Sequence, residues 1–154
     1  MIRTVAAGAA CVLVAATAAC SSSGGDPDAG GSHGADVSNA VCTKDAATKK
    51  VDLPAGFPSG FPLPSGTIVY KVDERGADEG IVVTGVTSTP FKTVLKSLQS
   101  ELPAKGFRAD NGEVEPHDAE SDWASSAFEG RWAIREIPQC DGDTLVNVVA
   151  RATS

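Results

Sequence analysis

A single stretch of helical spacing lies among segments that alternate like β-strands, and this arrangement limits the fold more than any other feature. Large apolar side chains recur at the spacing of one helix face: Phe91, Leu95, Leu98 and Leu102. We expect Thr89 to be the N-cap of this helix, Pro90 its first residue and Gly106 its end. One helix can cover only one sheet, which favours a single small domain.

Alternation of apolar and polar side chains predicts strands on both sides of the helix. The expected strands are 67–73, 81–87, one that begins at 107–110, 123–128, 131–137 and 144–152. Glu129-Gly130 is expected to form the turn between 123–128 and 131–137. We therefore predict an α+β fold with a single antiparallel sheet of about five to six strands, one helix packed on one face, and the order β-β-α-β-β-β(-β).

A proline-rich arm, 53–66, precedes the first expected strand. Its repeated prolines exclude helix and central strand and favour an extended, polyproline-like conformation. Phe57, Phe61 and Leu63 are its only large apolar side chains besides Leu53, and we expect these three to hold the arm against the domain.

The first twenty residues have the parts of an export signal. Arg3 and the amino terminus are positive, 5–19 is an uncharged run, and the run ends at Thr17-Ala18-Ala19-Cys20. A run of about 15 residues is shorter than the roughly 20 that span a bilayer, and it suits a cleavable signal. The cysteine and the small residues before it resemble the lipobox of bacterial lipoproteins, although Thr17 stands where that motif usually has Leu. An ordinary signal peptide and a buried helix are the alternatives.

The resemblance implies a lipid anchor. In lipoproteins the cysteine, here Cys20, receives a diacylglycerol with acyl chains such as palmitate, and the preceding peptide, here 1–19, is removed. We expect 20–41 to be the lipidated cysteine and a flexible linker, because 21–35 lack any large apolar side chain, and 42–154 to be the domain. The expected location is the extracytoplasmic side of the cell membrane.

The domain itself shows a looser resemblance. From FPLPSGT (61–67) onward, with a helix that ends in the Gly106-Phe107 step, it is similar to small, uncharacterised lipoprotein domains of high-GC Gram-positive bacteria. This resemblance implies a fold and no site.

The cysteines indicate the same compartment. Cys11 lies in the expected signal and Cys20 is the expected lipid carrier, which leaves Cys42 and Cys140 to form a disulfide outside the cytoplasm. Closing a loop of about a hundred residues stabilises by roughly 4 to 5 kcal/mol on the chain-entropy model. The alternative is two free thiols. No metal site is expected, because neither cysteine has a Cys or His neighbour at ligand spacing.

Charge limits the partners. The chain has 20 acidic and 13 basic residues, a net charge of -7, which argues against nucleic-acid binding. Alternation nevertheless places four cations on the helix-free face of the expected sheet: Lys71, Arg131, Arg135 and Arg151. We expect them to bind an anionic envelope ligand or a protein partner, and none belongs to the expected core. The alternative is ordinary solvent-facing charge paired with nearby carboxylates.

No catalytic motif is evident. The acidic stretch 110–122 lacks the residue order of a calcium loop and is interpreted as a solvated loop. His117 lies in that stretch and is the only imidazole of the domain, because His33 falls in the linker. No serine occupies a GxSxG elbow. We expect no catalytic residue, no metal and no cofactor.

The sequence therefore predicts a lipid-anchored, exported lipoprotein that acts as a non-catalytic binding or interaction module at the cell envelope. One alternative is an exported hydrolase or metal-dependent enzyme with an unrecognised site. The other is a structural envelope spacer that has no ligand.

Overall fold

The computed structural model describes residues 37–76 and 78–153. The expected signal peptide 1–19, Cys20, His33 and most of the expected linker 20–41 lie outside the described residues. No helix in the described ranges is long and apolar enough to span a membrane.

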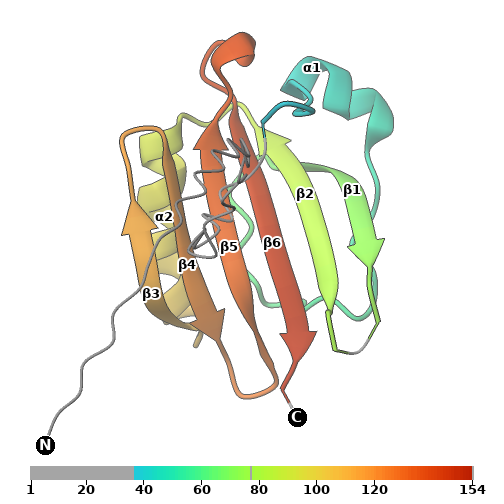
Figure 1. Cartoon of the computed structure of the whole chain (residues 1–154), viewed down its shortest axis with the longest axis vertical. Coiled ribbons are helices and arrows are strands. Elements are labelled where there is room, and N and C mark those ends of the chain that lie inside the picture. Colours follow the sequence, from blue (N-terminus) through green and yellow to red (C-terminus); the bar gives the residue numbers. More distant parts are fainter. Residues whose placement is uncertain (1–36, 77, 154) are drawn as a thin grey trace, which may run out of the picture. The chain divides into compact units, whose positions relative to one another are not determined.

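The described chain forms one antiparallel sheet with helices, so the coarse α+β prediction is confirmed (Figure 1). The strands are β1 (Ile68–Glu74), β2 (Ile81–Thr87), β3 (Arg108–Val114), β4 (Asp118–Ala124), β5 (Phe128–Glu136) and β6 (Thr144–Ala152). The helices are α1 (Thr43–Ala46), α2 (Phe91–Ala104) and the short 3₁₀ turns η1 (Ala47–Lys49) and η2 (Pro138–Cys140). Across the sheet the strand order is β1-β2-β6-β5-β4-β3.

The helix α2 covers one face of the sheet and encloses the main core. Phe91, Val94, Leu98 and Leu102 are its buried residues. Across the interface they meet inward side chains from the central strands, including Val83, Val148 and Trp132. The opposite face of the sheet is called the open face, because among the described residues no long helix covers it, and 37–46 and η2 pack on part of it.

The ends of α2 follow from local hydrogen bonding. Pro90, rather than Thr89, is the N-cap residue, and no side chain caps this end. The Thr89 hydroxyl lies instead within 3.4 Å of the Ser65 carbonyl. At the other end, Gly106 has a φ of +82°, and the Phe107 N–H donates to the Leu102 carbonyl at 2.9 Å. This is the Schellman arrangement that glycine permits.

The proline-rich arm packs against the core, as predicted. Phe57 and Phe61 are buried, and Leu63 is partly buried against the same cluster. The Phe61 ring centroid lies 4.9 Å from that of Trp123 and 5.6 Å from that of Phe107. Aromatic contacts of this kind add stability beyond the buried area, so these rings hold the arm under the sheet.

The acidic stretch 110–122 is not a loop, contrary to the prediction. It forms most of the hairpin β3–β4, in which alternate residues of β4 are buried. Its inward side chains before Trp123 are the small Ala119 and Ser121. Small inward residues leave no alternation of large apolar side chains in the sequence, so this strand was missed.

The predicted turn at Glu129-Gly130 is also wrong, because both residues lie inside β5. The β4–β5 turn falls at 125–127, where the Phe128 N–H donates to the Ser125 hydroxyl oxygen at 3.1 Å. A Cβ at Gly130 would collide with the Val149 carbonyl oxygen and lie 3.0 Å from the Trp123 ring. Glycine is therefore required here for packing rather than for a turn.

Residues at the start of the described chain cover part of the open face. Val37, Ala40 and Val41, which the sequence places in the linker, are partly buried there. They pack with α1 against a second cluster that includes Val86 and Leu145. The rest of the open face carries the charged residues considered next.

Candidate binding face

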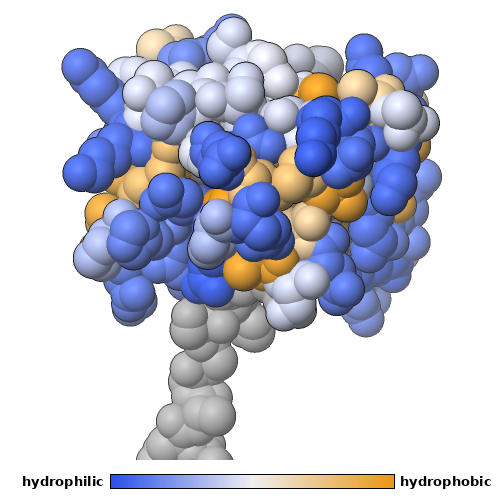
Figure 2. All heavy atoms as spheres, turned by 90° about the horizontal axis from the view of Figure 1, so that it is seen from above, coloured by the Kyte–Doolittle hydropathy of each residue, from blue (hydrophilic) through white to orange (hydrophobic). Residues whose placement is uncertain are grey.

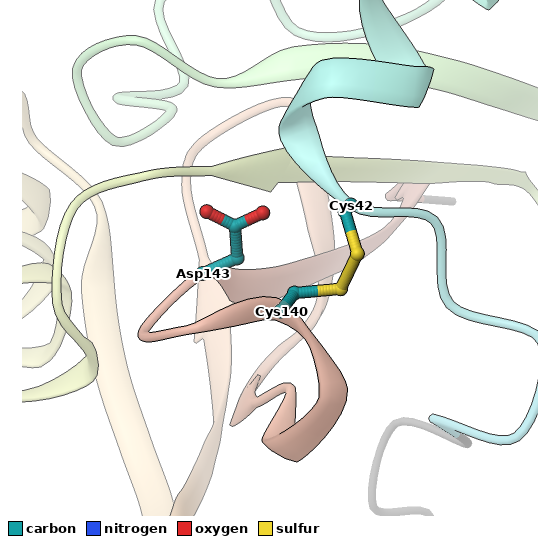
Figure 3. Close-up of side chains that lie close together, drawn as sticks. All are labelled: Cys42, Cys140 and Asp143. Atoms are coloured by element: carbon teal, nitrogen blue, oxygen red, sulfur yellow. A yellow bond between two sulfur atoms is a disulfide. The ribbon is translucent and has the colours of Figure 1, made fainter.

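Cys42 and Cys140 form a disulfide, as predicted (Figure 3). Their Cα atoms are 5.5 Å apart, and the bond links positions 98 residues apart in sequence. Both cysteines lie with Asp143 in the one group of potential metal-ligand residues found among 37–76 and 78–153. Metals bind cysteine as the thiolate, and the two sulfur atoms here are joined to each other in a disulfide. The two cysteines therefore link the chain covalently and are not metal ligands in this form.

The carboxylate of Asp143 is hydrogen-bonded to the first residue of α1. It accepts a hydrogen bond from the Thr43 backbone N–H at 2.7 Å and another from the Thr43 hydroxyl at 3.0 Å. Asp143 is only 7% exposed, so these donors replace water around its charge. The side chain therefore fixes the start of α1 beside the disulfide.

The four cations singled out in the sequence lie on strands that form the open face. Arg131 and Arg135 come from β5, opposite Val149 and Leu145 of β6. Lys71 of β1 pairs with Thr84 of β2. Arg151 lies near the end of β6 and pairs with Glu129 in the sheet register.

Each of these cations has a carboxylate partner. The ion pairs are Lys71–Asp73 at 2.8 Å, Arg131–Glu120 at 2.7 Å, Arg131–Asp122 at 2.8 Å, Arg151–Glu129 at 2.7 Å, and Arg135–Asp118. This pairing matches the alternative that the sequence left open, namely solvent-facing charge balanced by nearby carboxylates. A purely anionic ligand would have to displace these partners.

Arg131 is the most firmly held of the four. Its Nε donates to Asp122 and its Nη1 to Glu120, both on β4. The hydrogen bond to Asp122 is the main cause that raises the pKa of Arg131, and the charges of Asp122, Glu120 and Glu113 act in the same direction. The second carboxylate oxygen of Glu120 is buried without a hydrogen-bond partner. Arg131 therefore neutralises an acidic region between β4 and β5.

A groove of about 800 Å³ crosses the open face beside Arg131. Four guanidinium groups line it: Arg75, Arg108, Arg131 and Arg151. Five carboxylates also line it: Asp78, Glu79, Asp110, Asp122 and Glu129. Lys71 and Arg135 are not among the lining residues, so the groove unites only two of the four predicted cations.

The sequence analysis missed Arg75 and Arg108. Arg75 follows β1, and Arg108 is the first residue of β3, at the far edge of the sheet. The strand order brings both toward the end of β6. Only the order of strands could have identified them, and alternation within single strands does not contain that information.

His117 lies outside the groove. Its Nδ1 is 2.7 Å from a carboxylate oxygen of Glu136, and its side chain is 78% exposed. Both residues line a separate hollow of about 450 Å³ with Pro116 and the start of α2, at Phe91. Figure 2 views the domain from above, where small apolar areas are bordered by hydrophilic side chains. The contact between His117 and Glu136 is therefore exposed to solvent and lies beside the start of α2.

Comparison with protein-family models, with curated proteins and with solved structures finds no match to this chain.

Proposed function

We propose that this protein is a lipid-anchored lipoprotein on the extracytoplasmic side of the cell membrane, and that its domain is a non-catalytic binding or interaction module. The disulfide between Cys42 and Cys140 is the observation that carries the proposed location, because such bonds persist in oxidising compartments. The sequence Thr17-Ala18-Ala19-Cys20 supports the anchor.

The geometry of the open face supports a binding role. Its charged groove has a volume within the range of small-ligand sites. The domain's one histidine, His117, is exposed, and its Nδ1 lies 2.7 Å from a carboxylate oxygen of Glu136. These observations favour recognition over hydrolysis.

Processing at Cys20 tests the proposed anchor. The mature protein should be recovered from membranes with its first residue at Cys20 and with a mass that includes attached acyl chains. Cys20→Ala should leave an unprocessed precursor that still carries residues 1–19. Mass spectrometry that finds an unlipidated mature chain beginning elsewhere would overturn the anchor.

A thermal-shift screen separates the three functional classes. Divalent metals, wall glycans, anionic polymers and peptides are added to the purified protein, and the change in melting temperature is measured. A shift in melting temperature that disappears on charge reversal at the exposed Arg151 supports a binding module. Turnover of a glycan or ester substrate, measured in a separate activity assay, supports the enzyme. A chain that responds to none of them is a spacer.

A further inference from the structure

We propose that the groove beside Arg131 binds a short, extended peptide segment that carries charges of both signs. The inference rests on the proposed binding role and names the class of ligand and the residues that hold it. It follows from the position of the groove, from the charges that line it and from its length across the strands.

The groove gathers residues from distant parts of the chain. The end of β1 and the turn before β2 contribute Arg75, Asp78 and Glu79, while Arg108 comes from β3 at the opposite edge. Val149 of β6 lies between them and is only partly buried. The groove thus has an apolar side chain within a charged border, as peptide-binding surfaces often do.

The charges without partners in the groove are of both signs. Arg75, Asp78 and Glu79 have no ion pair with any residue of 37–76 or 78–153. A carboxylate of the ligand can take two hydrogen bonds from the Arg75 guanidinium. An ammonium or guanidinium group of the ligand can pair with Asp78 and Glu79.

The paired arginines favour the same class of ligand. Arg108 is held by Asp110 and Arg151 by Glu129, and the side chains of these arginines are 74% and 53% exposed. Exposed ion pairs of this kind contribute little to the free energy of folding, so a charged group of the ligand can replace the carboxylate partner of either arginine. A purely anionic ligand would leave Asp110 and Glu129 facing it, whereas a mixed-charge ligand satisfies the arginines and the released carboxylates together.

The size of the groove fits a segment of a few residues. It extends over β6, β5, β4 and β3, four neighbouring strands. Strands in a sheet lie about 4.8 Å apart, so this part of the groove is roughly 14 Å long, the length of about four extended residues, and Arg75, Asp78 and Glu79 line the groove beyond β6.

Binding of charge-defined tetrapeptides to the purified full chain tests this inference. Three classes of end-blocked probe are titrated by calorimetry: one Glu and one Lys in either order, two Glu, and two Lys, each with two Ala. Only the mixed class should bind saturably. Arg75→Ala should weaken that binding about tenfold, the effect of losing one charge-assisted contact, and Asp78→Ala with Glu79→Ala should weaken it at least as much.

Matched variants outside the groove exclude general charge effects. Lys50→Ala and Asp52→Ala remove exposed charges that do not line the groove and should leave the affinity unchanged. The inference is overturned if no probe class binds saturably, if the two-Glu or two-Lys probe binds as well as the mixed one, or if Arg75→Ala binds like the unmodified protein. A thermal shift with a glycan or an anionic polymer alone would retain the binding module and reject the peptide site.

Discussion

The carboxylate of Asp143 accepts a hydrogen bond from the backbone N–H of Thr43 at 2.7 Å, although the two residues are a hundred positions apart in sequence. Thr43 is the first residue of α1, and its N–H has no partner within the helix. A side chain that is distant in sequence but adjacent in space therefore performs the role that an N-cap residue usually performs locally.

Removal of this carboxylate should destabilise the domain. Asp143→Ala is expected to lower the free energy of unfolding by about 1 to 2 kcal/mol, the usual cost of losing a helix cap. Chemical denaturation followed by tryptophan fluorescence measures the change. Asp143→Asn keeps one acceptor oxygen and should lose less, and equal losses in the two variants would contradict the hydrogen-bond explanation.

Reduction of the disulfide should cost more than loss of the cap. The bond joins positions 98 residues apart in sequence and is expected to contribute roughly 4 to 5 kcal/mol on the chain-entropy model. Because 1 kcal/mol shifts the melting temperature of a domain this size by roughly 4 °C or more, the midpoint should fall markedly with reductant. Cys42→Ser with Cys140→Ser should show the same low midpoint and no further response to reductant.

Arg131 should matter to stability far more than Lys71. Arg131→Ala leaves Glu120 and Asp122 adjacent without their cation and is expected to cost about 1 to 3 kcal/mol. Lys71→Ala breaks an ion pair whose lysine is 60% exposed and should cost no more than about 0.5 kcal/mol. Denaturant midpoints compare the two, and similar losses would mean that Arg131 is ordinary surface charge.

The same contacts correct an expectation from the sequence. The sequence places Arg131 outside the expected core, and from that alone we would expect the fold to survive charge reversal at this position. In the structure, Arg131→Glu would place a third carboxylate beside Glu120 and Asp122. Tests of ligand binding should therefore use Arg75 or Arg151 instead.

Stability should fall in alkaline solution because of Tyr70. Burial is the main cause that raises its pKa above 10.0, and a hydrogen bond with the Val41 backbone and the Lys71 charge oppose this only in part. A raised pKa in the folded state means that the unfolded state loses the proton first. The contribution of Tyr70 to the free energy of unfolding is therefore fully present below pH 10 and is lost as the pH rises through the pKa of the folded state.

Tyr70 is the only tyrosine of the chain, so phenolate absorbance near 295 nm reports on it alone. The titration should have its midpoint above 10, and denaturation of Tyr70→Phe should show a smaller loss of stability over the same alkaline range. A midpoint at or below 10 would contradict the burial of this ring.

Gly130 should tolerate no larger side chain. Gly130→Ala would force the Cβ into the Val149 carbonyl and toward the Trp123 ring, and it should prevent or strongly weaken folding. At Gly60 the nearest atoms to an added Cβ are 4.0 Å away, in the Phe107 ring, so Gly60→Ala should fold normally. Circular dichroism and the melting temperature of both variants decide between these outcomes.

Strong local patterns allowed much of the fold to be predicted. Runs of β-branched residues predicted 81–87 and 144–152, which are the bounds of β2 and β6. The apolar stripe of α2 was equally clear. The start of β3 was predicted at 107–110, but most of the hairpin β3–β4 was interpreted as a loop, because the inward side chains of β4 before Trp123 are small and many of the others are charged.

The candidate site was only partly predictable. Alternation within 131–137 indicated that Arg131 and Arg135 share a face, even though the turn before them was misplaced. The carboxylates that pair with them come from β4, the strand that was missed. Their partnership depends on strand order and register, which emerge only when the sheet is assembled.

The disulfide also determines how the domain bears tension. Because Cys42 is bonded to Cys140, residues 43–139 form a closed covalent loop. A pull applied between residue 37 and the end of the described chain passes through the sulfur atoms and bypasses α1, the edge strand β1 and the proline-rich arm. The load falls on β6, which is hydrogen-bonded to β2 on one side and β5 on the other. Because β6 is already extended and is pulled at both of its ends, the tension stretches this one strand in place and applies little force that would separate the other strands of the sheet.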